Sequence, residues 1–236
     1  CKTFSKAVAT GVVEENNLMI SNPAVLQVAD NDWIMIYEMA PIRRPGQQGN
    51  SMPGPSNQRN LYLATSSNGK QFKKVGIAID SSKEDNYFAS VPDLVKTPDG
   101  KIRMYYVSRG DSIGSAISED NGHTWTRESG YRLTNMAVDP DISIQTKDGK
   151  TDWVLYYTVL DPQRNGIYKT TSEDGLTWQE GAKILSATTQ GAVVDADIVV
   201  VSDNLTVMFL GQSESGDSTG GETINLYRAE LDKSIF

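Results

Sequence analysis

The stretch from residue 139 to residue 178, DPDISIQTKDGKTDWVLYYTVLDPQRNGIYKTTSEDGLTW, holds the most complete copy of a pattern that runs through the chain. It contains three strand-like runs, 139–143, 153–158 and 167–171, separated by turn residues. Asp, Asn and Gly tolerate the left-handed backbone angles of tight turns, and β-branched and aromatic residues favour strands. This order predicts an antiparallel meander.

The same order occurs four times along the sequence. The first strands are expected at 22–26, 91–95, 139–143 and 195–199; the second at 33–38, 102–107, 153–158 and 206–210; the third at 61–65, 113–117, 167–171 and 224–229; and a fourth near 75–78, 131–134 and 183–186. Four short antiparallel strands in each repeat of about 50 residues are typical of a β-propeller blade.

We therefore expect an all-β fold, a β-propeller of four-stranded antiparallel blades in a single domain, 1–236. The expected blades are about 19–79, 80–134, 135–186 and 187–236. The last repeat lacks a fourth strand, and residues 7–13 are predicted to supply it and close the ring, which would hide two sheet edges. A five-bladed ring is the alternative.

Composition narrows the chemistry. The 236 residues carry a formal net charge of −8, which argues against a nucleic-acid partner because a phosphate backbone needs a basic surface. One Cys and one His exclude an internal disulfide and a Cys- or His-rich metal site. No apolar run reaches the length of about 20 residues that spans a bilayer. Carboxylates, hydroxyls, amides, Arg and aromatic residues remain as functional groups.

Two loops after the third strands share a motif. Residues 118–125 read SEDNGHTW and residues 172–178 read SEDGLTW. Asp and Ser side chains can bond nearby backbone N–H groups, while Gly takes a positive φ and the Trp packs back on the hairpin. We expect Asp120, Asp174 and His123 to be structural, since these loops lie opposite the entrances of the first strands.

These motifs resemble carbohydrate-active propellers. The 118–125 loop is similar to the Asp box of sialidases. The Asp-Pro-Asp entrance at Asp139, the Asp-Gly turn and the Tyr-Tyr strand resemble the five-bladed arabinanase, β-xylosidase and invertase-type glycoside hydrolases. The resemblance implies a glycoside hydrolase-like protein acting on an oligo- or polysaccharide.

The entrances of the first strands carry the candidate site. Strands converge near the axis of a propeller, so their leading carboxylates are expected to face a common mouth and to raise one another's pKa. Glycoside hydrolysis needs such a pair of carboxylates. The same groups could instead cap strand entrances, and Asp139 with Asp195 could bind a structural Ca²⁺; no other cofactor is expected. The polar residues of this set are Asn22, Asp93, Asp139, Asp141, Asp195 and Asp197.

The resemblance also implies roles. The related enzymes have a general base at the position of Asn22, which cannot ionise, and a pKa-tuning carboxylate at the position of Asp93. Their general acid is a Glu whose nearest counterpart is Asp195, with Glu38 as another candidate. Asp139 is then the candidate base.

Loops on the same face supply candidate substrate-binding residues. Arg side chains there could bind a substrate carboxylate, or could be solvated or paired with the rim. Tyr rings could stack on sugars, although packing between blades is the commoner use of such residues. The candidates are Arg43, Arg44, Arg109, Arg164, Tyr106 and Tyr157.

Two functions remain open. One is a glycosidase; the other is a non-catalytic carbohydrate-binding or protein-interaction propeller, which Asn22 favours. A carbohydrate partner, a monomeric state and an extracellular or periplasmic location are expected. Cys1 is what a lipid-anchored bacterial lipoprotein would present at its N-terminus.

Overall fold

The computed structural model describes residues 7–15, 17–42, 54–81, 83–147, 150–186, 192–202, 205–214 and 223–231. These residues form strands and one short 3₁₀ turn, η1 (Pro55–Asn57), and none of them forms a helix able to cross a bilayer. The strands are β1 (Leu18–Ala29), β2 (Asp32–Pro41), β3 (Asn60–Ser66), β4 (Lys73–Ile79), β5 (Ala89–Lys96), β6 (Ile102–Ser108), β7 (Ser112–Ser118), β8 (Thr126–Arg127), β9 (Ala137–Lys147), β10 (Lys150–Val159), β11 (Gly166–Ser172), β12 (Ala182–Leu185), β13 (Val193–Ser202), β14 (Leu205–Glu214) and β15 (Thr223–Leu231).

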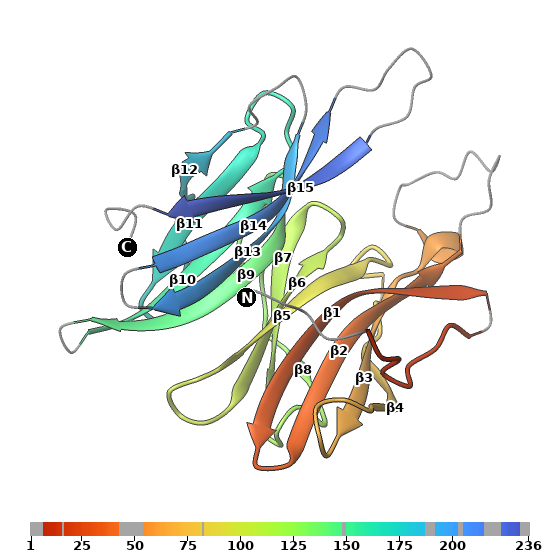
Figure 1. Cartoon of the computed structure of the whole chain (residues 1–236). Coiled ribbons are helices and arrows are strands. Elements are labelled where there is room, and N and C mark those ends of the chain that lie inside the picture. Colours follow the sequence, from red (N-terminus) through yellow and green to blue (C-terminus); the bar gives the residue numbers. More distant parts are fainter. Residues whose placement is uncertain are drawn as a thin grey trace.

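The strands form four antiparallel sheets arranged as a four-bladed β-propeller (Figure 1). Each sheet is a simple meander in chain order: β1–β4, β5–β8, β9–β12 and β13–β15. The first strand of each blade contacts that of the next, β1 with β5, β5 with β9 and β9 with β13. The predicted fold class is confirmed.

Each interface between neighbouring blades is built from the second strands. Successive side chains of a strand point to opposite faces, so each second strand packs on one blade with its odd positions and on the other with its even ones. The contacting sets are Ile34 and Ile36 with Met104 and Tyr106, then Tyr105 with Leu155 and Tyr157, then Val154 and Tyr156 with Met208 and Leu210. The apolar cores therefore lie between the blades.

The expected closure of the ring by residues 7–13 is wrong. Among the described residues this segment forms no strand beside β15, and it lies against the first blade instead. The Phe72 amide donates to the Thr10 carbonyl at 2.7 Å, and Val12 packs on a cluster that includes Tyr37 and Phe72. The segment covers apolar side chains on the outer face of the first blade. On β15, the strand predicted to pair with this segment, the side chain of Leu226 is 88% exposed.

The fourth strand of the second blade also differs from expectation. β8 is formed by Thr126–Arg127, not by residues 131–134. The chain turns at Gly130, whose φ is 77°, and it returns to β7 only at Ile113, which bridges to Leu133 and accepts the Arg132 amide at 2.7 Å. Residues 131–135 thus become a connection that runs along the outside of the blade interface.

The two related loops fold as the sequence predicts. Asp120 accepts hydrogen bonds from the Thr124 amide at 2.8 Å and its hydroxyl at 2.6 Å, which helps lower the pKa of Asp120 to about 2. Asp174 makes the equivalent bonds to Thr177. These aspartates are therefore structural parts of their loops.

The loop at residues 172–178 also fastens two blades together. Tyr105 of the second blade donates its hydroxyl to the Gly175 carbonyl at 2.5 Å, and Arg103 donates to the Asp174 carbonyl at 3.1 Å. A Cβ on Gly175 would lie 2.6 Å from the Arg103 guanidinium and 2.7 Å from the Trp153 ring. Close approach and a φ of 70° both favour glycine there.

We predict that Gly175→Ala destabilises the protein more than Gly100→Ala does. Both glycines have a positive φ, so both substitutions incur the left-handed penalty of about 1–2 kcal/mol. Only the Cβ at residue 175 would meet a neighbour, since nothing lies within 4 Å of one at Gly100. The additional overpacking should lower the free energy of unfolding by about 1–3 kcal/mol, measured by urea denaturation. Equal losses in the two variants would show that this contact between blades is unimportant.

Candidate functional site

A repeated distortion positions the candidate site. The pairing of each first strand with its second strand is interrupted at the same place, where an extra residue forms a β-bulge. The bulge residue has a positive φ in every blade: 49° at Asn22, 44° at Val91, 51° at Asp139 and 52° at Asp195. Asn and Asp tolerate this conformation, whereas Val rarely adopts it. The fold therefore imposes the bulge even where the side chain does not favour it.

Two bulge residues meet at the interface between the third and fourth blades. The Asp195 amide donates to Asp139 Oδ2 at 3.4 Å, and this contact makes the two side chains neighbours. Burial, and then the charge of Asp195, raise the pKa of Asp139 to about 7. Partial burial also raises the pKa of Asp195. This pair, called the central carboxyl pair below, retains a proton near neutral pH.

The aspartates two residues after the bulges tie each blade to the next. Asp93 Oδ2 accepts the Ile142 amide at 2.7 Å, and Asp141 Oδ2 accepts the Ile198 amide at the same distance. Asp93 Oδ1 also accepts the amide of Leu94 at 2.8 Å. These bonds place both carboxyl groups on the first strand of the following blade.

Burial dominates the titration of these ties. Desolvation raises the pKa of Asp93 to about 6, against the lowering effect of its two amide donors. Desolvation, and then the charge of Asp93, raise the pKa of Asp141 to about 8; a hydrogen bond with Asp197 acts in the same direction. Five of the predicted acidic residues thus lie together at the centre of the ring. Asp93 and Asp141 accept hydrogen bonds from backbone amides of the next blade. Asp139 is half-buried, and Asp195 and Asp197 are exposed.

Glu38 lies at the interface between the first two blades and is only 1% exposed. Its Oε2 accepts from the Asn22 amide group at 2.8 Å and from the Ser90 hydroxyl, while Oε1 accepts from Arg59 at 2.9 Å. Both carboxylate oxygens are therefore engaged, and the arrangement suits a positioning residue. Because a carboxylate can only accept, Asn22 must donate its NH₂ group to Glu38, which leaves its carbonyl oxygen for a ligand.

Sequence reasoning missed the partners of Glu38. Arg59 follows it by 21 residues and Ser90 by 52, and no local motif connects them. The Arg59 guanidinium also lies 4.6 Å from the centroid of the Phe88 ring. Only the meander topology, which places β3 and the start of β5 beside the end of β2, brings these residues together.

The predicted substrate-binding Arg and Tyr residues that the structure describes have contacts of their own. Arg109 lies over the Tyr131 ring, 5.6 Å from its centroid, and Arg164 pairs with Asp161 and Glu180. Tyr106 and Tyr157 are buried in the packing between blades. Arg43, Arg44 and Cys1 lie outside the described residues.

The residues at the centre do not make a complete calcium site. Ca²⁺ takes six to eight oxygen ligands. Within the described part of the chain, no group of three or more His, Cys, Asp or Glu side chains is arranged to hold a metal ion. The structure therefore does not test the predicted calcium site at Asp139 and Asp195, and we derive no chemistry through calcium.

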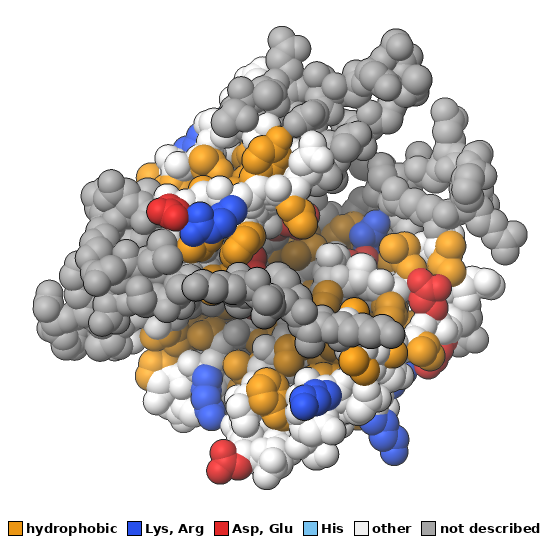
Figure 2. All heavy atoms as spheres, in the orientation of Figure 1, with side chains coloured by type: hydrophobic (Ala, Val, Ile, Leu, Met, Phe, Trp, Pro, Cys, Tyr) orange, Lys and Arg blue, Asp and Glu red, His pale blue; other side chains and the backbone are white. Residues whose placement is uncertain are grey.

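Figure 2 shows that the molecule is hollowed near the middle of the face in view, with acidic side chains visible inside the hollow. The central residues are partly accessible: Asn22, Asp195 and Asp197 are exposed, and Asp93, Asp139 and Asp141 are half-buried. A solvent-borne ligand can therefore reach carboxyl groups that still hold protons.

We predict that stability falls as the pH rises from about 4 to about 8. The folded protein keeps protons on Asp139 and Asp141, with pKa values of about 7 and 8, which the unfolded chain loses near the model-peptide value of 3.8. Each such proton reduces the free energy of unfolding by about 1 kcal/mol per pH unit across this window, and the effect ends above the folded-state pKa.

Denaturant titrations between pH 4 and pH 9 on wild type and on Asp139→Asn/Asp141→Asn test this prediction. The double variant should show a flatter dependence, because its amides do not titrate. Asp30→Asn, an exposed residue in the β1–β2 turn, serves as the control and should keep the wild-type slope. An unchanged slope in the double variant would contradict the assignment.

Comparisons with known proteins place the fold. The chain resembles a glycosyl hydrolase from Bacteroides ovatus, with 15% identity, a TM-score of 0.61, and coverage of 93% of this chain and 68% of that chain. A second similar structure comes from work on the GH130 family of mannoside phosphorylases, which contains glycoside hydrolases that target β-1,2 mannosidic linkages in Candida mannan. It is 17% identical, with a TM-score of 0.63, and the match covers 93% of this chain and 68% of that chain.

A further glycoside hydrolase structure is similar at 15% identity and a TM-score of 0.65, with coverage of 93% of this chain and 73% of that chain. No family model and no curated protein matches the sequence. At these identities the likeness shows the fold: a propeller of the kind found in glycoside hydrolases.

Proposed function

We propose that this chain is a carbohydrate-active propeller that binds an oligo- or polysaccharide at the centre of the ring and hydrolyses a glycosidic bond there. The central carboxyl pair carries the proposal. The similar structures, a glycosyl hydrolase and hydrolases of β-1,2 mannosidic linkages among them, support it.

The central carboxyl pair suits a general acid. A catalytic acid must hold its proton at the working pH, and a pKa of about 7 for Asp139 meets that need. In the proposed step the pair donates its proton to the glycosidic oxygen as the bond to the anomeric carbon breaks. Water adds its hydroxyl to that carbon and gives its remaining proton to a second carboxylate.

The second carboxylate has to come from outside the pair. Acid and base groups stand about 5–5.5 Å apart in retaining glycosidases and about 6.5–9.5 Å apart in inverting ones. Asp139 and Asp195 are direct neighbours, and the charge of Asp195 acts on the titration of Asp139, so we assign them to a single proton-holding unit and not to an opposed base and acid. Asp197, exposed and two residues beyond Asp195, is the proposed water-activating group.

Carbohydrate binding without hydrolysis is the second candidate. The first bulge residue is Asn22, whose amide cannot take up a proton in such a step. Glu38 beside it has both oxygens engaged, and so does Asp93. The first two blades thus offer hydrogen bonds but no free base.

We predict that Asp139→Asn and Asp195→Asn each reduce glycoside hydrolysis by at least about 100-fold, the usual contribution of a positioned acid. Hydrolysis of an aryl-glycoside panel and of polysaccharides is the measurement, with binding of the same glycans measured in parallel. The substitutions preserve shape, so binding should change only a few-fold.

Asp30→Asn, in the β1–β2 turn, is the control, and its hydrolysis rate and glycan binding should match those of wild type. Full activity in both central variants would contradict the proposed acid. Binding by the wild-type protein without turnover of any substrate would favour the second candidate.

A further inference from the structure

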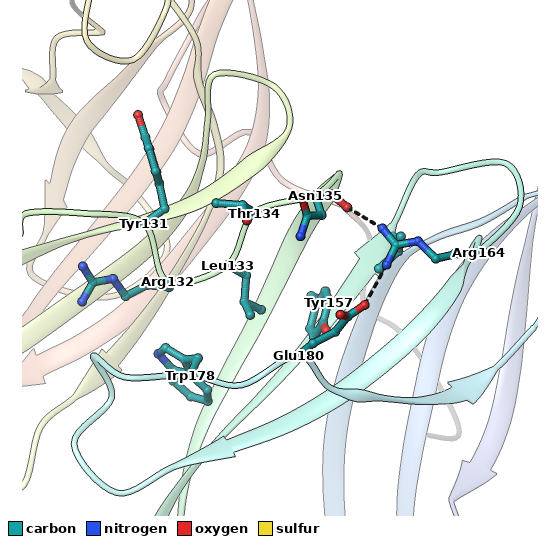
Figure 3. A pocket seen from close by; sticks show the side chains of 10 residues that line it. Tyr131, Arg132, Leu133, Thr134, Asn135, Tyr157, Arg164, Trp178 and Glu180 are labelled. Atoms are coloured by element: carbon teal, nitrogen blue, oxygen red, sulfur yellow. Dashed lines mark hydrogen bonds and ion pairs between the residues drawn. The ribbon is translucent and has the colours of Figure 1, made fainter.

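We propose that a cavity on the outside of the interface between the second and third blades binds a single neutral sugar ring, independently of the central site. The cavity measures about 200 Å³ and is lined by Leu133, Asn135, Tyr157, Arg164, Trp178 and Glu180, among others. It is called the outer pocket below. Figure 3 shows Leu133, Tyr157 and Trp178 along its wall, with Asn135, Glu180 and Arg164 grouped at one end.

Asn135 is the polar group that the pocket leaves free. Its side chain is exposed and makes no hydrogen bond to any residue in the described part of the chain. The backbone is left-handed at two consecutive positions, with φ of 65° at Asn135 and 66° at Met136. Strained backbone of this kind persists only where its surroundings hold it, and it is concentrated at functional sites.

Three hydrogen bonds hold that backbone in place. Arg164 Nη2 donates to the Asn135 carbonyl at 3.1 Å. The Met136 amide donates to the Asp111 carbonyl and the Leu160 amide to the Met136 carbonyl, both at 3.0 Å. The backbone that carries Asn135 is thus held at the pocket before any ligand arrives, so binding need not order this segment.

The aromatic and aliphatic side chains of the wall present mainly carbon surface, beside the polar side chains of Arg132 and Thr134. Trp178 Nε1 already donates to the Gly175 carbonyl at 3.1 Å, and the Tyr157 hydroxyl accepts the Gly181 amide at 2.8 Å. Leu133 adds an aliphatic surface. A ligand must therefore place an apolar face against the wall and its polar groups toward Asn135.

Both arginines that line the pocket are engaged, and Arg132 donates to the backbone carbonyls of Leu176, Ser129 and Gly130. Arg164 pairs with Glu180 at 2.7 Å and with Asp161 at 3.3 Å, so the guanidinium has no charge to spare for an anion. A carboxylate oxygen of exposed Glu180 can still accept a hydrogen bond from a ligand hydroxyl. The ligand that fits this set is neutral, has an apolar face and carries adjacent hydroxyls, which describes a pyranose ring.

Size limits the ligand to one ring. Pockets for drug-sized ligands measure about 300–1,000 Å³, and this one is smaller. A few hydrogen bonds and one apolar face correspond to a dissociation constant of about 1 mM. Such an outer site would hold one unit of a glycan at the perimeter of the ring.

The experiment uses methyl glycosides of common neutral pyranoses as probes and saturation-transfer NMR as the readout. We expect at least one probe to bind the wild-type chain, and Asn135→Gly to weaken that binding at least about 10-fold. Glycine accepts the positive φ at this position, so the fold is preserved. Asn121→Gly is the matched control: Asn121 has a φ of 58° and is exposed in the 118–125 loop, and this variant should bind as wild type does.

The double variant Asp139→Asn/Asp195→Asn separates this site from the central one. Binding that survives in the double variant and is lost in Asn135→Gly supports the outer pocket, whether or not the protein hydrolyses glycans. Binding lost in the double variant but kept in Asn135→Gly would overturn the outer pocket and leave the proposed function standing. No binding of any probe at tens of millimolar would also overturn it.

Discussion

The left-handed residue at the start of each innermost strand is the constraint on which the centre of this protein depends. The bulge changes the alternation of the strand once, so that a bulge residue and the residue two positions later both come to the centre. Val91 shows that the backbone, and not the side chain, requires this conformation, since its φ is 44°. A substitution at a bulge position therefore changes the chemistry of the centre while the framework persists.

The carboxylates at the centre serve the fold and the proposed chemistry at once. Asp93 and Asp141 each accept a hydrogen bond from a backbone amide of the next blade. Forming this bond requires burial of a carboxyl group, which costs desolvation free energy. Because these ties already occupy part of the acidic set, the number of aspartates in the sequence overstates the number free to react. The neighbouring bulge residues Asp139 and Asp195, together with exposed Asp197, are the groups left over.

The blades could be predicted from the sequence because their signals are local. Turn residues, alternating apolar positions and the Ser-Asp-Gly-Trp loops each act within a few residues, and hydrogen bonds such as Thr124 to Asp120 follow directly from them. The contacts that sequence reasoning missed join distant segments, as Arg59 and Ser90 do at Glu38, or Thr10 at Phe72. They depend on which face each blade leaves open, and no single repeat contains that information.

Two of the blade interfaces place different groups beside their carboxyl side chains. At the interface of the first two blades, Glu38 pairs with the Arg59 guanidinium and accepts hydrogen bonds from two neutral donors, Asn22 and Ser90. At the interface of the third and fourth blades, Asp139 faces another carboxyl group, and no Lys or Arg of the described chain contributes to its titration. Burial of Asp139 and the charge of the neighbouring Asp195 both disfavour its ionised form, so the pKa of Asp139 is raised. The two interfaces thus differ in the group beside the carboxyl side chain, an arginine at Glu38 and a second carboxyl group at Asp139.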